Sequence, residues 1–299
     1  MGNATSPIRK DSDASGETKR LERDMTVGTY IIRGGAEGRE RLRVLNRVLR
    51  GDTTALLNRV GVRSGMQCLD AGCGGGDVTL ELAGRVVPGG HVIGMDLDET
   101  KLELARVEAA RCGIDNVTYR AGDVTNGSLP SGFDLVYARF LLTHLVEPEA
   151  AVRGFVDSLG PGGICVVEDI DVSGCFCYPE SDAYRAAIEL YCATALDRGV
   201  DPDIGRRLPE LLAAAGCEDV SVNVTQPAGA RTDLGGELDT KLLMALTIDA
   251  ITESAVEAGL ATSEEVHALA EELHALADDP GTFMSMPRVV QAWGRRPSL

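Results

Sequence analysis

The sequence predicts an α/β fold in which helices cover both faces of a mostly parallel sheet. From Met66 onward, strand-like and helix-like segments alternate, with short turns between them. A glycine-rich loop follows the first strand, and acidic residues stand at or just after the ends of several strands. Alternating strands and helices form parallel sheets, and the ligands of such sheets bind outside the carboxyl ends of the strands. These observations predict a ligand site at that edge of the sheet.

Length and composition limit the class of protein. With 299 residues, 44% of them hydrophobic, the chain can form one enlarged domain. The net charge of −17 argues against non-specific nucleic-acid binding, because phosphates would be repelled. No apolar run reaches the roughly 18 residues that suggest a membrane span, and the start of the chain has no apolar signal region. The 8 cysteines are scattered, with no CxxC pair. We therefore expect a reduced, cytoplasmic protein without a membrane or nucleic-acid partner.

The part of the chain before the sheet is predicted to be a tail and a lid. Residues 1–24 are polar, which predicts a disordered tail. Apolar residues recur at helical spacing within 25–60, which predicts an N-terminal helical lid. Gly51 and Asp52 predict an interruption of that helix.

The elements of the sheet follow in order. The predicted strands are 66–70, 91–96, 117–121, 134–138 and 164–169, and the helices between them are 77–86, 98–112 and 146–158. Turns rich in glycine and proline separate them. After residue 169 we expect helices at 180–198 and 204–215, a strand at 218–225, an acidic helical stretch at 237–277 and a final strand at 283–294.

The glycine-rich loop and the next strand end indicate a nucleoside cofactor. Glycine lets the backbone approach a ligand closely, and Asp96, which ends the second strand, can accept hydrogen bonds from both hydroxyls of a ribose. The dinucleotide pattern GxGxxG fits less well, because Asp77 stands where its third glycine belongs. A P-loop is excluded, since its Lys-Ser/Thr pair is absent.

With these motifs the chain resembles the class I S-adenosylmethionine (SAM)-dependent methyltransferases. The matching segments are LDAGCGGGD at 69–77, VIGMDLD at 92–98, AGDV at 121–124, FDLVYARFLLTHL at 133–145 and LGPGGICVVED at 159–169. The resemblance is closest to bacterial small-molecule methyltransferases, many of them in secondary metabolism. It implies a Rossmann-like, seven-stranded sheet within 61–299, with acceptor-covering insertions at about 172–215 and 230–282. It also implies SAM as cofactor and S-adenosylhomocysteine as product.

The resemblance implies a role for residues around the methionine portion of SAM. Asp70 and the backbone at Gly72 and Gly74 would line this portion. Arg139, just after the fourth strand, would lie near its end. Tyr30 would close over the cofactor from the lid.

Four further residues would hold the nucleoside. Asp96 would accept from both ribose hydroxyls, and Leu97 would lie against the adenine. Asp123 would accept from the adenine amino group, and Val124 would offer a backbone N–H. Each acid could instead serve only as a cap or turn residue, and for Asp98 we expect a cap.

A base and an acceptor site are predicted beyond the fourth and fifth strands. His144 is the best candidate for a base, because imidazole titrates near neutrality, although a structural role remains open. Glu168, Asp169 and Asp171 form an acidic cluster that could supply a base, bind a cationic acceptor or only make turn bonds. A metal site there would need further ligands, and we predict none. The residues expected to bind the acceptor are Phe140, Glu168, Asp169, Phe176, Tyr178, Met244 and Phe283.

The expected activity is methyl transfer from SAM to a small, largely apolar metabolite in natural-product biosynthesis, with carbon or oxygen favoured as the acceptor atom. The sequence leaves two alternative functions open. The protein could be an NAD(P)-dependent oxidoreductase, or a SAM-fold protein that no longer methylates and acts as a binding or assembly partner. RNA methylation is disfavoured by the acidic charge. The surface is compatible with homo-oligomerisation.

Overall fold

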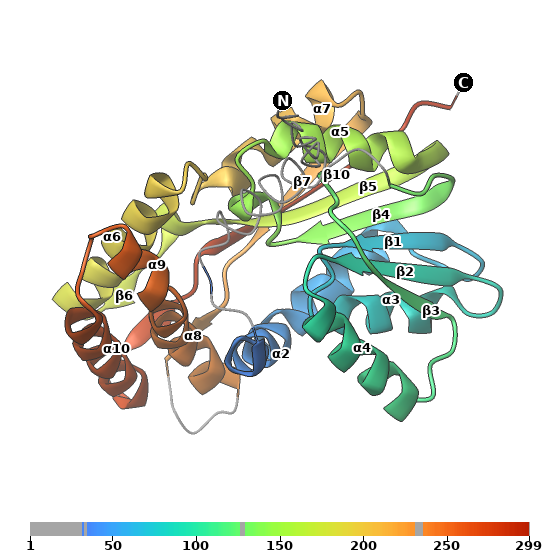
Figure 1. Cartoon of the computed structure of the whole chain (residues 1–299). Helices are drawn as coiled ribbons and strands as arrows, with labels where there is room; N and C mark the ends of the chain where they lie inside the picture. The colour runs from blue at the N-terminus through green and yellow to red at the C-terminus, as the bar shows by residue number, and fades with distance from the viewer. Residues whose placement is uncertain (1–31, 33–34, 126–128, 231–235, 299) are drawn as a thin grey trace, which may run out of the picture.

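The fold is built on one seven-stranded sheet, seen in a computed structural model that describes residues 32, 35–125, 129–230 and 236–298 (Figure 1). The strand order is β3-β2-β1-β4-β5-β10-β7. The strands are β1 (Gln67–Ala71), β2 (His91–Asp96), β3 (Val117–Ala121), β4 (Phe133–Arg139), β5 (Leu159–Asp171), β7 (Glu218–Thr225) and β10 (Arg288–Arg295). All neighbours are parallel except β10, which runs antiparallel to β5 and β7. The predicted fold class is confirmed.

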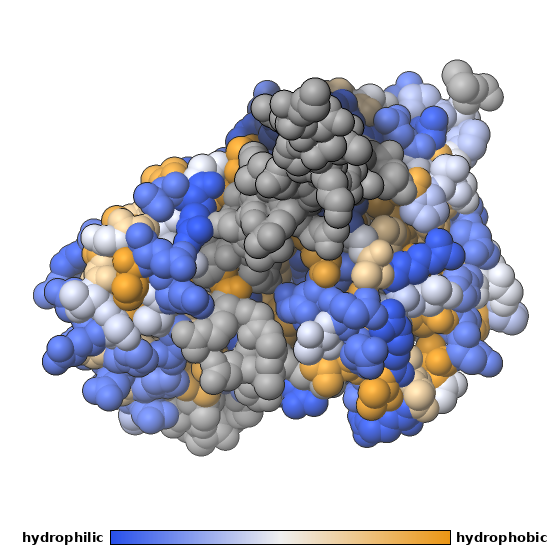
Figure 2. Space-filling view, viewed as in Figure 1, coloured by the Kyte–Doolittle hydropathy of each residue, from blue (hydrophilic) through white to orange (hydrophobic). Residues whose placement is uncertain are grey.

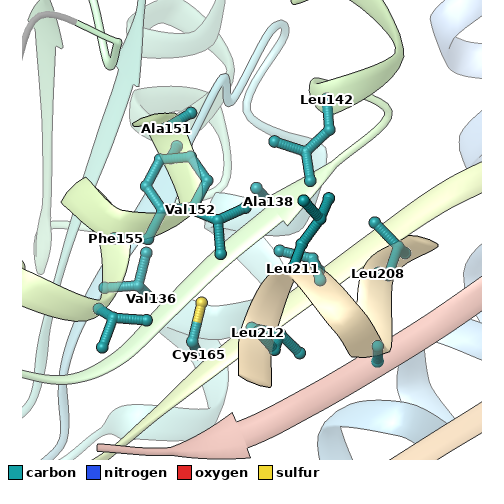
Figure 3. Close-up of a cluster of buried hydrophobic side chains, with 14 of the residues drawn as sticks. Val136, Ala138, Leu142, Ala151, Val152, Phe155, Cys165, Leu208, Leu211 and Leu212 are labelled. Carbon is teal, nitrogen blue, oxygen red and sulfur yellow. The ribbon is translucent and has the colours of Figure 1, made fainter. Parts of the chain in front are cut away.

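Helices cover both faces of this sheet because apolar side chains of the central strands alternate between the faces. Leu135 and Tyr137 of β4 pack with one cluster, and Val136 and Ala138 with the other. The first face is covered by α3 (Asp77–Val86) and by part of α2 (Gly35–Val60); the second is covered by α5 (Pro148–Ser158) and α7 (Leu208–Ala214). Figure 3 shows side chains of α5 and α7 meeting those of β4 and β5 in the second cluster. The last covering helix is α4 (Glu99–Arg111).

A helical lobe lies beyond the carboxyl ends of the strands, at the left of Figure 1. Its helices are α6 (Asp182–Asp197), α8 (Gly236–Ala250), α9 (Thr252–Glu257) and α10 (Ser263–Asp278). A three-stranded sheet of β6 (Cys177–Tyr178), β9 (Phe283–Ser285) and β8 (Ala228–Gly229) belongs to the same lobe. Short 3₁₀ helices cover Leu142–His144 (η1), Val172–Gly174 (η2) and Ile204–Arg207 (η3).

The helix α2 connects the lobe to the sheet. It runs through Gly51 without a break, so the predicted interruption was wrong. Gly51 is exposed with open space around it, whereas Leu49 and Leu56 on either side are buried, and this packing outweighs the weak helix propensity of one glycine. The first part of α2 packs with Leu243 of α8, and its last turns pack with the sheet. The predicted tail at 1–24 lies outside the described residues.

The predicted single strand at 283–294 is in fact two strands. Met286 and Pro287 separate β9, which pairs within the lobe, from β10, which pairs within the main sheet. Proline has no backbone N–H to give to a strand ladder, which explains the break. The acidic stretch at 237–277 forms three helices, and the predicted helix at 204–215 begins as a 3₁₀ turn.

The visible surface is mostly hydrophilic. On the face shown in Figure 2, apolar residues of the described part of the chain form small separate patches. None of the helices in the described part of the chain is both long and apolar enough to cross a bilayer.

Gly205 lets η3 lie directly on the end of β5. A Cβ atom at this position would come 2.7 Å from the carbonyl oxygen of Ile170 and 2.8 Å from that of Asp169, and neither backbone atom can move away cheaply. We expect Gly205→Ala to lower the free energy of unfolding by about 1–3 kcal/mol, measured by urea unfolding. Gly84→Ala, in an exposed position of α3 with nothing nearby, is the control and should raise stability by about 0.5–1 kcal/mol. Equal effects of the two changes would contradict this account.

Candidate cofactor and acceptor site

A cavity of about 760 Å³ opens at the carboxyl ends of β1 to β5. Its walls come from the strand ends, from α2 and from the helical lobe. This volume lies in the upper part of the roughly 300–1,000 Å³ range that holds one drug-sized ligand. The cavity is therefore large enough for a ligand of nucleoside size.

The loop after β1 forms one wall of the cavity. Gly72 and Gly74 have φ of 72° and 52°, a region that favours glycine. The Gly72 N–H donates to the carbonyl of Met95 at 2.8 Å, which fixes the loop against β2. A Cβ atom on Gly72 would lie 3.0 Å from the side chain of Leu141. The loop thus needs glycine for both its conformation and its packing, and it presents backbone to the cavity.

Asp96 at the end of β2 is held by backbone N–H groups. Its Oδ2 accepts from Gly74 at 2.8 Å and its Oδ1 accepts from Asp98 at 2.9 Å. Each oxygen keeps a lone pair, so the carboxylate can accept from a ribose diol. Asp98 lines the rim and caps α4 by accepting from Thr100 and Lys101, which confirms the cap that we expected there.

The neighbouring strand end supplies the surroundings that an adenine ring needs. Leu97 is 49% exposed at the cavity rim, and Val124 is buried against it from the loop after β3. Asp123 uses one oxygen, Oδ1, to accept from the backbone and hydroxyl of Thr125 at 2.8 and 2.6 Å. Its second oxygen is available to a ligand. Apolar faces beside an acceptor match a purine with an amino group, so the residues present fit the nucleoside of SAM.

Asp70 and Arg139 meet at the inner end of the cavity. Asp70 is buried and accepts from the Thr79 hydroxyl at 2.6 Å, and burial raises the pKa of its carboxyl to about 6. Arg139 donates to the Thr53 hydroxyl of α2 at 3.0 Å. A carboxylate and a guanidinium in one place suit the ammonium and carboxylate of an amino acid. They would fit the methionine end of SAM, and this role stays a prediction.

The part of the cavity toward the lobe is mainly apolar. Its lining side chains include Leu42 and Leu45 of α2, Ile188 and Tyr191 of α6, Leu243 and Met244 of α8, and Phe140 and Met286. We call this part the acceptor chamber. Phe140 has a φ of 53°, an uncommon value for a non-glycine residue, and its ring centroid lies 5.8 Å from the Arg139 guanidinium carbon. The aromatic ring thus lies close to the methionine end.

His144 also lines the cavity and is buried at the end of η1. Burial lowers the pKa of its imidazole to about 3, and the charges of Arg41 and Lys101 act in the same direction. The ring is therefore neutral at physiological pH but accepts a proton only weakly. Its predicted role as a base stays a prediction.

Glu168 and Asp169 do not line the cavity, contrary to their predicted role in acceptor binding. Glu168 accepts hydrogen bonds from the Tyr137 hydroxyl and from Gln291, and Asp169 accepts from the backbone of Thr143 and Ile170. Because both carboxylates face inward to donors of the protein, they are not available to an acceptor. The third member of the cluster, Asp171, pairs with Arg206 at 2.7 Å and Arg288 at 2.8 Å.

Three predicted aromatic contacts also lie outside the cavity. Phe176, Tyr178 and Phe283 are partly exposed in or beside the small sheet of the lobe, where the rings of Phe176 and Phe283 meet edge to face at 5.1 Å. The pairing of β9 with β6 draws them away from the chamber. Tyr30 lies outside the described residues.

The cavity also contains residues that we did not predict. Leu42, Leu45 and Thr53 of α2 and Ile188 and Tyr191 of α6 line the cavity or bond to its wall. Helical periodicity marks their apolar faces, but it does not distinguish a residue of the core from one that faces a cavity.

Comparisons with known proteins agree with this site. A family model described as a methyltransferase domain matches residues 62–206. The nocamycin O-methyltransferase of Saccharothrix syringae is 37% identical over 109 residues, which is 36% of this chain and 39% of that protein. A ubiquinone biosynthesis O-methyltransferase of Leptothrix cholodnii is 33% identical over 106 residues, 35% of this chain and 44% of that protein. The chain thus spans less than half the length of these curated relatives.

The fold has a close counterpart among solved structures. The YcgJ protein of Bacillus subtilis superposes with a TM-score of 0.53 at 16% identity, covering 82% of this chain and 97% of that one. At this identity the likeness concerns the fold alone. Fold, cavity and family match together define a nucleoside-binding α/β domain, and residues 62–206 carry a class I SAM-dependent methyltransferase domain. In this family SAM is the methyl donor and S-adenosylhomocysteine is the product.

Asp96→Ala should weaken the binding of S-adenosylhomocysteine about 10- to 100-fold, because hydrogen bonds to a charged group are worth about 1.5–3 kcal/mol. Isothermal titration calorimetry measures the change. Asp134→Asn is the matched control, since this exposed carboxylate accepts from Gln67 at the opposite end of β1. Unchanged binding in the Asp96 variant, or tighter binding of NADH than of S-adenosylhomocysteine to the wild type, would contradict the assignment.

The burial of His144 should make the free energy of unfolding depend on pH in the acid range. Its pKa falls from an ordinary 6.5 to about 3 in the folded protein, so the unfolded chain binds the proton more readily between these values. The free energy of unfolding should therefore fall as the pH drops through this window. This one histidine can change the free energy of unfolding by at most about 1.4 kcal/mol per pH unit.

The raised pKa values of Asp70 and Asp169 act in the opposite direction, but they are common to wild type and variant. At pH 5 we therefore expect the wild type to have lost about 2 kcal/mol relative to His144→Gln, measured by urea unfolding. His267→Gln, on the exposed side of α10, should follow the wild type. Parallel pH profiles of wild type and His144→Gln would refute this.

Proposed function

We propose that the protein transfers a methyl group from SAM to an oxygen or carbon atom of a small, largely apolar metabolite. The observation that carries this proposal is the continuity of one cavity, in which the nucleoside wall at Asp96 and Asp123 joins the apolar acceptor chamber. Oxygen is favoured as the acceptor atom, since the two curated relatives are named as O-methyltransferases.

For methyl transfer, the protein mainly has to align the acceptor with the methyl group of SAM and exclude water. When bound, SAM would supply an electrophilic methyl group, and the carbon–sulfur electron pair would stay on sulfur. The new bond would be formed by a lone pair of an oxygen acceptor or by the π electrons of an enol carbon, and the proton of the acceptor would be lost to solvent. In-line alignment of the two partners provides most of the acceleration. Phe140, Met244 and Met286 would shape the chamber and keep it dry.

None of the predicted base candidates offers the chamber a strong base, which narrows the chemical class of the acceptor. His144 accepts a proton only weakly, and Glu168 and Asp169 face inward. We therefore favour an acceptor whose hydroxyl is more acidic than that of an ordinary alcohol, such as a phenol or an enol. His144 would then orient the acceptor by hydrogen bonding.

Polar groups at the far end of the chamber suggest an amphipathic acceptor. Arg198 pairs with Glu257 there, and Glu253 and Ser254 of α9 also line the cavity. This mixture of donors and acceptors suits hydroxyl groups, so the proposed acceptor has an apolar body and an oxygenated end. Such compounds are common products of secondary metabolism, which is the biological setting that we propose.

Met244→Asp tests the chamber. A carboxylate on this buried wall should repel apolar acceptors and reduce methyl transfer from labelled SAM at least about tenfold across a panel of phenols and enols, since burying a charge is costly. Binding of S-adenosylhomocysteine should change less than about threefold, because the nucleoside wall is untouched. Val107→Asp, at a 65% exposed site of α4, is the control. Cofactor binding without methyl transfer to any acceptor in the wild type would favour a non-catalytic SAM-fold protein instead.

A further inference from the structure

We infer that Glu168 is a buried counter-charge that makes the site prefer the cationic methyl donor over its neutral product. This inference rests on the proposed function. The carboxylate of Glu168 does not line the cavity. It acts by its charge from behind Tyr137 and Arg139, which do line it.

Glu168 belongs to a row of polar side chains that crosses four strands. Arg139 of β4 stands opposite Glu168 of β5, Glu168 opposite Gln291 of β10, and Gln291 opposite Asn223 of β7. The Asn223 amide donates to the Gln291 carbonyl at 2.8 Å, and the Gln291 amide donates to Glu168 Oε2 at 2.6 Å. In both hydrogen bonds the donor lies on the side of β7 and the acceptor on the side of Glu168. The Gln291 amide is thus oriented by Asn223 to donate to the Glu168 carboxylate.

The other oxygen of Glu168 is occupied as well. Oε1 accepts from the hydroxyl of Tyr137, which is fully buried and stands opposite Asp70 in the pairing of β4 with β1. Burial is the largest influence and raises the pKa of Glu168 on balance, with Asp52 acting in the same direction, although Arg139, Tyr137 and Gln291 act to lower it. With a donor on each oxygen and a guanidinium in register, the carboxylate has the surroundings that an ionised group needs.

The acids around Arg139 outnumber this guanidinium, although Arg41 and Lys101 also line the cavity. Asp70 and Glu168 flank Arg139, and Asp77 at the start of α3 also lines the cavity and acts on Arg139. Although burial opposes its charge, Tyr137, Glu168 and Asp70 hold the pKa of Arg139 above its ordinary range. At least two carboxylates therefore face one guanidinium in a region of low dielectric.

An excess of negative charge distinguishes the two cofactor forms. SAM and S-adenosylhomocysteine have the same nucleoside and the same amino-acid end, but SAM carries an additional methyl group and a positive sulfonium. A buried carboxylate attracts the sulfonium over several ångströms, since the interior screens charge much less than water does. It has little effect on the thioether. Glu168 should therefore favour replacement of the product by a new molecule of SAM.

The test is the ratio of two dissociation constants in Glu168→Gln. We measure binding of SAM and of S-adenosylhomocysteine by calorimetry at pH 8, where Asp70 is ionised. Removing the charge should weaken SAM relative to S-adenosylhomocysteine about three- to tenfold. The ratio is insensitive to a general loosening of the site, because such a change would weaken both ligands alike.

Two variants separate charge from structure. Tyr137→Phe removes one hydrogen bond but keeps the carboxylate, and should leave the ratio within about twofold of the wild type. Glu218→Gln removes the same charge at the exposed start of β7 and should leave it unchanged. Equal weakening of both ligands in Glu168→Gln, or an unchanged ratio, would overturn the inference. A wild-type protein that binds neither ligand would overturn the proposed function, and the inference with it.

Discussion

The parallel pairing of β1 with both β2 and β4 is the constraint on which the rest of the site depends. The order of the strands reverses at β1: β2 and β3 lie on one side of it, and β4 and β5 lie on the other. The space outside the strand ends is left open by the backbone, as is general for sheets of this kind. Asp70, Asp96 and Arg139 meet there only because their strands are in this register. The glycines after β1 follow from the same constraint, since the loop must turn tightly beneath Leu141.

The second feature of the site is a set of charged side chains in the interior, where solvent screens them poorly. The chain is strongly acidic, yet the carboxylates near the cavity each have defined partners: backbone N–H groups for Asp96, a hydroxyl for Asp70, and a phenol and an amide for Glu168. Partnered carboxylates keep fixed positions, and fixed charges stabilise a cationic ligand without reorganising. Arg139 balances two of these acids and is itself held by Thr53 of α2. The electrostatics of the site is thus tied to the covering helix as well as to the sheet.

The cover over the cavity is assembled from remote parts of the chain. The helix α2 packs on the sheet at one end and on α8 at the other, where Arg47 makes a two-pronged ion pair with Asp239 at 2.7 and 2.9 Å. The acceptor chamber therefore combines side chains from α2, α6 and α8 with the strand ends. The nucleoside wall, in contrast, comes from one continuous stretch between β1 and the loop after β3. This division matches the chemistry, in which one cofactor is common to many acceptors.

The sequence by itself determined the sheet and the nucleoside wall, because both depend on local patterns. Strand–helix alternation, the glycine loop and an acid at the end of β2 are each visible within a few residues. Tertiary structure alone decided which polar residues face the cavity. Glu168 and Asp169 end a strand as Asp70 and Asp96 do, but side-chain direction and the antiparallel strand β10 turn them to Gln291 and to the backbone. Likewise, Phe283 follows β9 into the lobe, whereas Met244 reaches the chamber from α8. Such outcomes depend on contacts between elements far apart in the chain, and no local pattern in the sequence records them.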